Sequence, residues 1–356
     1  MRTKLFDLLF LIVAGFLVFY LSQKPVYNWD MISYMGVATE YSVHDPQVVH
    51  DSVYHDLKRE VPAPVYRDLT GDHEERRACL LSSKEYNDQL SYFRAKPLYT
   101  LMIAGLNKAG VSLVRATLIP SIIACFFLML LVYHWLSLYL KKPFAFVTAL
   151  LMSLLPIFIE LDRFSTPDAV SNFFVLLSLY LVTTGKNKWW ILLSLFLSVV
   201  ARVDNFVLAI VVAYFLYLKG TKNVVWKLGI VGAVAGISII GIPVLMGDSP
   251  TWFTKFAFLG SVTSYVNHWR DVIYTLRTDA LYLLLILATA FMLRKADYAI
   301  KMPLIIIVIT ILARLILFPS LQERFYAAYE FAVIILLVKY LSIRPGLIKL
   351  KRVRAM

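Results

Sequence analysis

The sequence predicts an all-α polytopic membrane protein with about ten transmembrane helices. Of its 356 residues, 60% are hydrophobic and only 17% are charged, and the mean hydropathy is +0.70. A soluble domain of this size carries more charge and fewer apolar residues. Apolar stretches long enough to cross a bilayer core about 30 Å thick recur along the chain. Examples are Leu5–Ser22, Leu113–Leu140, Phe144–Ile159, Val225–Met246 and Pro303–Pro319.

Short basic clusters between the apolar stretches predict the topology. They lie at Lys141–Lys142, Lys186–Lys188, Lys219–Lys227, Arg294–Lys301 and Arg344–Arg354. The positive-inside rule places all of them in the cytoplasm, together with the N-terminus. The net charge of +13 is therefore interpreted as membrane topology and not as nucleic-acid binding. Ten crossings with both termini inside satisfy every cluster.

This topology divides the chain into five parts. We expect a first transmembrane helix (1–22), an outer loop with interfacial helices (23–112), transmembrane helices 2–7 (113–246), a second outer loop (247–278), and transmembrane helices 8–10 with a basic cytoplasmic tail (279–356).

The individual helices follow from the apolar runs between these boundaries. In the outer loop, the run 97–108 is apolar but too short to span, which predicts an interfacial helix. The segment 189–218 begins and ends inside, so we expect a hairpin that turns at Arg202–Val203–Asp204. The other expected spans are 113–140, 144–160, 168–184, 225–246, 279–293, 302–319 and 327–343.

Charged residues at membrane depth are costly and usually functional. In the ten-helix topology they gather on the outer side, at positions 30, 160–168, 202–204 and 323–324. Carboxylates act as general bases toward hydroxyl groups, and arginine suits phosphate oxygens. Apolar helices around such groups suit a lipid tail. The pattern predicts an outward-facing site for a lipid-linked phosphate.

The order of these features resembles the GT-C superfamily of membrane glycosyltransferases, which includes the protein O-mannosyltransferases and the aminoarabinose transferase that acts on lipid A. An aspartate follows the first helix in Asn28-Trp29-Asp30, and the outer loop closes on Arg94-Ala95-Lys96-Pro97-Leu98-Tyr99. A second aspartate opens a helix in Ser165-Thr166-Pro167-Asp168, and Glu323-Arg324-Phe325-Tyr326 precedes the last helix. The chain departs from the family pattern in its single Pro97 and its lone Asp30.

The resemblance implies transfer of a sugar from a polyprenyl-phosphate donor to a glycan, lipid or protein acceptor, with inversion. Asp30 would accept the proton of the acceptor hydroxyl, and Asp168 would orient the acceptor, with Asp162 competing for that role. Arg324, supported by Lys96 and Arg202, would stabilise the leaving phosphate. No cofactor is expected and no metal ligand is assigned, although a divalent metal stays open. Membrane lipids are the other expected partners. We expect a multi-pass protein of a bacterial inner membrane, with the site facing the periplasm or outside.

Each of these residues also has a purely structural interpretation. Asp30 could cap a helix, Asp168 could favour a helix N-terminus through the dipole, and Arg324 could snorkel to lipid headgroups. Lys96 could snorkel as well, Arg202 could pair with Asp204 at the hairpin tip, and Arg314 could meet either a phosphate or a carboxylate. Two other functions remain as alternatives, namely a transporter or flippase of a lipid-linked or anionic substrate, and a non-catalytic subunit of envelope assembly.

Overall fold

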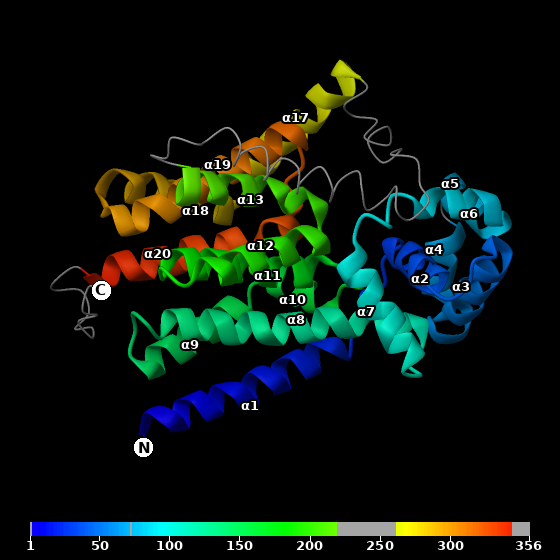
Figure 1. The fold of residues 1–356 in the computed structure, drawn as a ribbon, viewed down its shortest axis with the longest axis horizontal. Coiled ribbons are helices and arrows are strands. Elements are labelled where there is room, and N and C mark those ends of the chain that lie inside the picture. The colour runs from blue at the N-terminus through cyan, green and yellow to red at the C-terminus, as the bar shows by residue number, and fades with distance from the viewer. Residues whose placement is uncertain (1, 72, 219–260, 344–356) are drawn as a thin grey trace.

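The computed structural model describes residues 2–71, 73–218 and 261–343, and every regular element in these ranges is a helix. The long helices run side by side in one bundle, and a cluster of short helices sits at one end of it (Figure 1). The bundle contains α1 (Arg2–Ser22), α8 (Leu113–Leu136), α11 (Asp168–Thr183), α12 (Lys188–Ala201), α13 (Phe206–Ala213), α18 (Ala280–Lys295), α19 (Tyr298–Leu317) and α20 (Ala327–Ile343).

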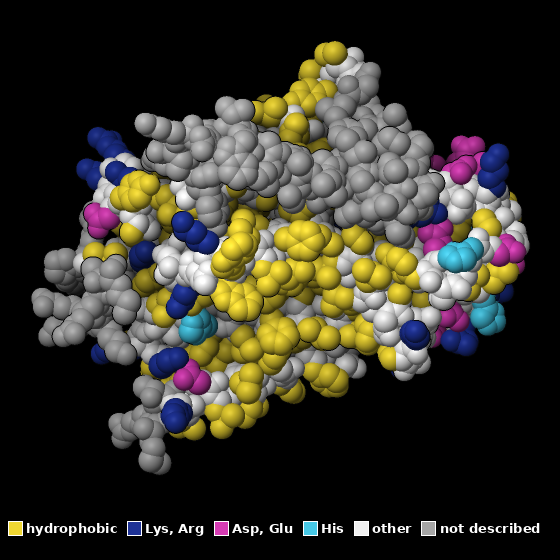
Figure 2. All heavy atoms as spheres, in the orientation of Figure 1, with side chains coloured by type: hydrophobic (Ala, Val, Ile, Leu, Met, Phe, Trp, Pro, Cys, Tyr) yellow, Lys and Arg dark blue, Asp and Glu magenta, His cyan; other side chains and the backbone are white. Residues whose placement is uncertain are grey.

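Three of the described helices, α1, α8 and α19, are long and apolar enough to cross a membrane, and two bent helix pairs raise the number to five. Hydrophobic side chains cover a broad band over the bundle, and charged side chains gather at its two ends (Figure 2). The expected membrane-protein class is therefore supported. The ten crossings stay a prediction, and the expected span 225–246 lies outside the described residues.

The span expected at 144–160 is instead two helices, α9 (Lys142–Ser153) and α10 (Pro156–Arg163), which meet at 68°. Pro156 causes the break because proline lacks an amide hydrogen and disfavours the helical conformation in the residue before it. Leu155 accordingly has an extended backbone, with φ −62° and ψ 139°. The helical structure is also interrupted at the expected turn 202–204. Arg202 has an extended backbone there, between the end of α12 and the 3₁₀ turn Val203–Asn205.

The described part of the second outer loop is also helical. It forms α17 (Val262–Thr278), which meets α18 at 84°. The Asp279 carboxylate accepts hydrogen bonds from the amides of Leu281 and Tyr282, so it caps α18 and fixes the corner. The rest of the expected loop, 247–260, lies outside the described residues.

The short helices form a compact outer cluster with its own buried side chains. It consists of α2 (Asp30–Glu40), α3 (Pro46–Glu60), α4 (Ala63–Gly71), α5 (Glu74–Leu81) and α6 (Ser83–Leu90). Tyr86 is 1% exposed and donates a hydrogen bond to the carbonyl of Ile32, which joins α6 to α2. Arg94 forms a buried ion pair with Glu40 at 2.5 Å. The cluster continues through α7 (Pro97–Lys108), which packs against α2 and α8.

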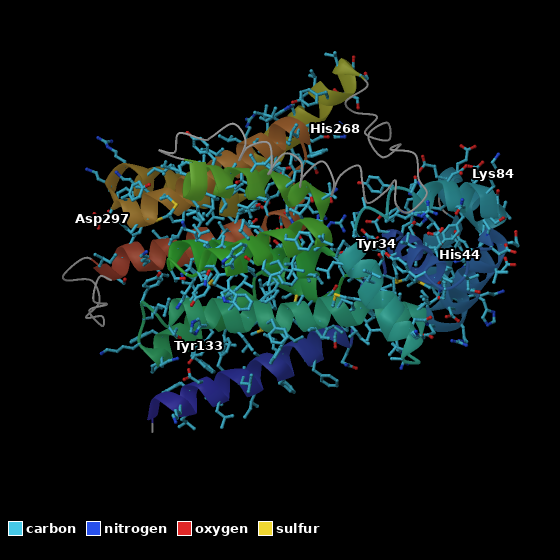
Figure 3. The ribbon with its side chains drawn as sticks, viewed as in Figure 1. Tyr34, His44, Lys84, Tyr133, His268 and Asp297 are labelled. Atoms are coloured by element: carbon cyan, nitrogen blue, oxygen red, sulfur yellow. The ribbon has the colours of Figure 1, made fainter. Side chains whose placement is uncertain are left out.

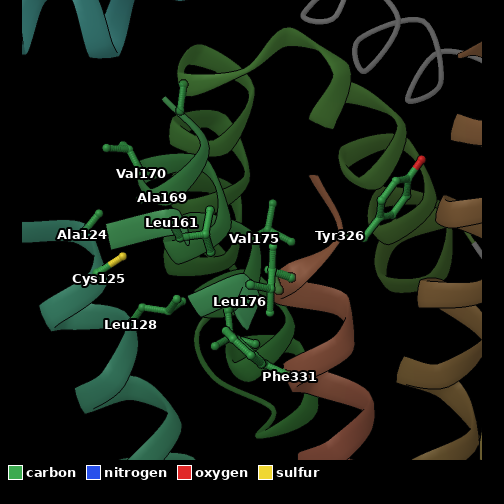
Figure 4. Packing of buried hydrophobic residues seen from close by; sticks show 14 of the residues in the cluster. Ala124, Cys125, Leu128, Leu161, Ala169, Val170, Val175, Leu176, Tyr326 and Phe331 are labelled. Atoms are coloured by element: carbon green, nitrogen blue, oxygen red, sulfur yellow. The ribbon is translucent and has the colours of Figure 1, made fainter. Parts of the chain in front are cut away.

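Helix α11 lies at the centre of the bundle and packs against α8, α12 and α20. Its apolar side chains pack against those of the neighbouring helices in a buried hydrophobic core (Figure 4). Cys125 of α8, Leu161 of α10, and Leu176 of α11 are all at most 1% exposed, as is Phe331 of α20. This packing fixes the starting residue of α11, Asp168, at the end of the bundle that faces the outer cluster.

Candidate active site

A cavity of about 410 Å³ lies where the outer cluster meets the bundle. Tyr34, which lies at this junction in Figure 3, is part of its wall, and His268 of α17 contributes from another side. Segments far apart in the sequence supply the charged groups of the lining. These are Asp30, Lys96, Asp168, Arg202, Asp204, Arg314 and Arg324.

Asp30 is the first residue of α2, and its backbone amide donates to the side chain of Asn28 at 2.5 Å. Its carboxylate has no hydrogen bond or ion pair with any residue that the structure describes. The position at the N-terminus of a helix is one that suits a negatively charged side chain. Asp30 is therefore a carboxylate in the cavity that is open to accept a proton from a bound hydroxyl.

Asp168 has the opposite environment, since only 1% of it is exposed and several groups bind its carboxylate. Arg202 forms an ion pair with it, Thr166 donates a hydrogen bond at 2.7 Å, and the Nε of Arg324 lies at 3.5 Å. Protein groups therefore occupy both oxygens of this carboxylate. The geometry suits an orienting role better than a role as base.

Arg202 is saturated by protein partners. Besides Asp168, it binds Asp204 through Nε at 3.1 Å and through Nη2 at 3.0 Å, and its guanidinium lies 4.0 Å from the Phe325 ring centroid. Asp204 also pairs with Arg314, which donates a further hydrogen bond to the carbonyl of Phe325 at 3.1 Å. Arg314, Asp204, Arg202, Asp168 and Arg324 thus form one row of alternating charge.

Arg324, at one end of this row, is the arginine whose charge is least neutralised. Its Nε and Nη2 donate to the neutral side-chain oxygen of Gln322 at 3.2 and 3.0 Å. The carboxylate of Asp168 is too far for a normal hydrogen bond. Arg324 therefore keeps a guanidinium edge that an anion could occupy in place of Gln322.

Lys96, just before α7, has no carboxylate partner among the described residues. Its ammonium donates to the hydroxyl of Tyr34 at 2.8 Å and lies 4.8–5.1 Å from the ring centroids of Tyr34, Tyr92 and Phe93. Burial under these rings, followed by repulsion from Arg202, lowers the pKa of Lys96 to about 8. A cation in this position gains from any added negative charge.

The cavity thus brings together five of the six residues that the sequence predicts for the site, and Asp162 is the exception. Asp162 lies in α10 with 0% exposure, and neither carboxylate oxygen has a partner among the described residues. It does not line the cavity. The sequence suggested Asp162 because it falls in the same expected outer turn as Asp168, but the structure places it inside α10, which ends before the turn that carries Asp168 to the cavity.

Sequence reasoning did not assign Tyr34, Asp204 or Arg314 to the site, although all three line the cavity. Tyr34 follows Asp30 by four residues, a spacing that puts both on one face of a helix and could have revealed it. The sequence left undecided whether Arg314 binds a phosphate or a carboxylate, and in the structure it pairs with the carboxylate of Asp204.

Comparison with known families supplies independent information. Residues 95–246 match the family model described as dolichyl-phosphate-mannose-protein mannosyltransferase. This match confirms the resemblance to the GT-C superfamily of membrane glycosyltransferases. No curated protein and no solved structure matches the chain. The GT-C match supports a membrane glycosyltransferase that uses a lipid-linked sugar donor. It covers Lys96, Asp168 and Arg202, whereas Asp30 and Arg324 lie outside the matched residues.

Proposed function

We propose that this protein transfers a sugar from a polyprenyl-phosphate donor to a hydroxyl group of a glycan, lipid or protein acceptor. The observation that carries this proposal is the division of charge in one cavity. Asp30, a carboxylate with no ion pair among the described residues, lies in the same cavity as two cations with little neutralisation. Lys96 has no described carboxylate partner, and Arg324 has one only at 3.5 Å, in Asp168. The other charges, Asp168, Arg202, Asp204 and Arg314, neutralise one another.

The proposed reaction needs one proton transfer and one bond exchange. Asp30 accepts the proton of the acceptor hydroxyl while the oxygen of that hydroxyl bonds to the anomeric carbon of the sugar. The bond from that carbon to the phosphate oxygen breaks, and the polyprenyl phosphate leaves with the electron pair. A phosphate is a good leaving group, so the site needs charge stabilisation and no general acid. Attack from the side opposite to the phosphate inverts the anomeric carbon.

The donor headgroup would sit against Lys96 and would replace Gln322 at the guanidinium edge of Arg324. Arginine binds phosphate oxygens through two parallel hydrogen bonds, and lysine acts as a point charge. Asp168 would hold Arg324 in place and orient the acceptor, and Arg202 would support both. The polyprenyl tail would extend along the apolar surface of the bundle.

The membrane topology of this proposal is the one that the basic clusters predict. Ten crossings would place the outer cluster and the cavity on the side opposite to the cytoplasm. In a bacterial inner membrane that side is the periplasm. The lipid-linked donor would enter from the bilayer, and the acceptor would enter from the aqueous side.

Donor binding by the purified protein in detergent tests the phosphate site. Charged hydrogen bonds contribute about 1.5–3 kcal/mol, so Lys96→Gln and Arg324→Gln should each weaken binding of a fluorescent polyprenyl phosphate by about 10- to 100-fold. The matched control is Lys84→Gln, because Lys84 is exposed on α6 at the far side of the outer cluster (Figure 3). Equal affinity of all three variants would contradict the proposed phosphate site.

Turnover separates the proposed enzyme from the two alternatives. A polyprenyl-phosphate sugar incubated with the enzyme and an acceptor should yield free polyprenyl phosphate and glycosylated acceptor in equal amounts. A transporter in sealed vesicles would move the labelled lipid to the other leaflet without breaking the bond between sugar and phosphate. A non-catalytic subunit would do neither.

A further inference from the structure

Asn172 joins two site segments that are distant in the sequence. It lies in α11, one turn after Asp168, is 3% exposed and does not line the cavity. Its side-chain nitrogen donates to the backbone carbonyl of Arg324 at 2.7 Å and to that of Asp168 at 2.8 Å. Its side-chain oxygen accepts from the backbone amide of Ala328 at 2.8 Å. Both hydrogens of the amide group are therefore used.

The two halves of this amide have different roles. Ala328 is the second residue of α20, and the first amides of a helix lack partners within the helix. The oxygen of Asn172 satisfies one of them and so caps α20 from a neighbouring helix. The nitrogen instead ties the main chain of Arg324 to the main chain of Asp168.

This tie determines where the Arg324 guanidinium can lie. The adjacent carbonyl of Phe325 is held by Arg314, so the short segment that carries Arg324 is fixed on both sides. The Nε of Arg324 stays 3.5 Å from Asp168, too far for a close hydrogen-bonded pair. If the segment moved toward α11, Arg324 would come within hydrogen-bond distance of Asp168 and would be neutralised more fully. If it moved away, the guanidinium would leave the cavity.

We propose that Asn172 is the positioning residue for Arg324, and that it sets the affinity of the site for the phosphate of the donor lipid. This inference rests on the proposed function. The sequence gives no sign of it, because an asparagine inside an apolar helix has no marked pattern. Asn172 acts through Arg324 and touches no substrate.

The variant Asn172→Asp separates positioning from helix capping. It keeps an oxygen that accepts from Ala328 and replaces the donating nitrogen with an oxygen that faces two carbonyls. At neutral pH this carboxylate repels both carbonyls. When it is protonated, it can again donate to one of them. The nearest charged groups are Asp168 on α11 and Arg324 before α20. Beyond them lie Arg202, Asp204 and Arg314, which pair with one another.

The readout is the Kd for undecaprenyl phosphate, measured by fluorescence in detergent with the full chain. Losing the donor to a buried carbonyl should raise the Kd of Asn172→Asp at about pH 7 by about tenfold relative to the wild type. At about pH 5 the ratio of the two Kd values should fall toward one, because a protonated carboxyl can again donate to one of the two carbonyls. A ratio of one at both pH values, with the wild type binding, overturns the positioning role alone.

Two controls make the result decisive. Asn205 is equally buried, and its side-chain nitrogen donates to Ser171 and to the carbonyl of Ser198, so Asn205→Asp adds a carboxylate without releasing Arg324. Its Kd ratio should show no recovery at low pH, and a recovery like that of Asn172→Asp would overturn the inference. If Asn172→Asp does not fold, Asn172→Ala removes the tie without adding a charge, and an unchanged Kd then overturns it. A wild type that does not bind undecaprenyl phosphate overturns the proposed function itself.

Discussion

The variant Asp30→Asn replaces one carboxylate oxygen with an amide group of nearly the same size. Asp30 has no ion pair and no side-chain hydrogen bond among the described residues, so no neighbour loses a partner. Substitutions of this kind change the free energy of unfolding by about 0.5 kcal/mol or less. Its effect should therefore fall on the reaction and not on the fold.

The magnitude follows from the proposed role of Asp30 as base. A positioned general base contributes about 10²–10⁴-fold to a rate, which corresponds to about 3–5 kcal/mol of the barrier. Because Asp30 does not bind the phosphate in this mechanism, kcat should fall by that factor while the Kd for polyprenyl phosphate stays close to the wild-type value. Transfer of a labelled sugar from the lipid donor, measured under single turnover, reports the chemical step.

The matched control is Asp168→Asn, which makes the same chemical change in the same cavity. Asp168 is buried between Arg202 and Arg324, and removing one partner of a buried ion pair costs about 3–5 kcal/mol. This variant should lose thermal stability and donor affinity together. The reasoning fails if Asp30→Asn transfers sugar at the wild-type rate, or if it loses as much stability as Asp168→Asn.

Three further predictions follow from the charged groups. Burial lowers the pKa of Lys96 to about 8, and the side chain is positively charged below that pKa. Donor affinity should therefore fall as the pH rises through about 8. In a titration of Kd against pH, Lys96→Arg should keep the charge and abolish this step. Arg314→Gln leaves Asp204 with one cation, which should lower the free energy of unfolding by about 3 kcal/mol and lower the midpoint of thermal unfolding. A further Asp204→Asn substitution should recover part of this loss. Asp162→Asn should keep wild-type turnover and equal or greater thermal stability, because it removes an unpartnered buried carboxyl outside the cavity, and a large loss of kcat would return Asp162 to the site.

The sequence by itself determined which long apolar segments are helical and which residues carry charge into an apolar setting. Leu113–Leu136 and Asp168–Thr183 are helices close to the expected bounds because long apolar runs leave the backbone few other ways to satisfy its hydrogen bonds. Asp30, Lys96, Asp168, Arg202 and Arg324 stood out for a related reason. A charge within an apolar part of such a chain is costly, so its presence alone marks the residue as a candidate for the functional site.

Only the tertiary structure decided which of these charges are paired and which are open. Asp204 and Arg314 are 110 residues apart, and Asn172 reaches the backbone of Arg324 across 152 residues. Such pairings depend on how α11, α19 and the segment before α20 pack, and no local pattern encodes the distances between them. The packing buries Asp168 among cations, leaves Asp30 without an ion pair to any residue that the structure describes, and keeps Asp162 out of the cavity. The three carboxylates look alike in the sequence, and their different surroundings give them different chemistry.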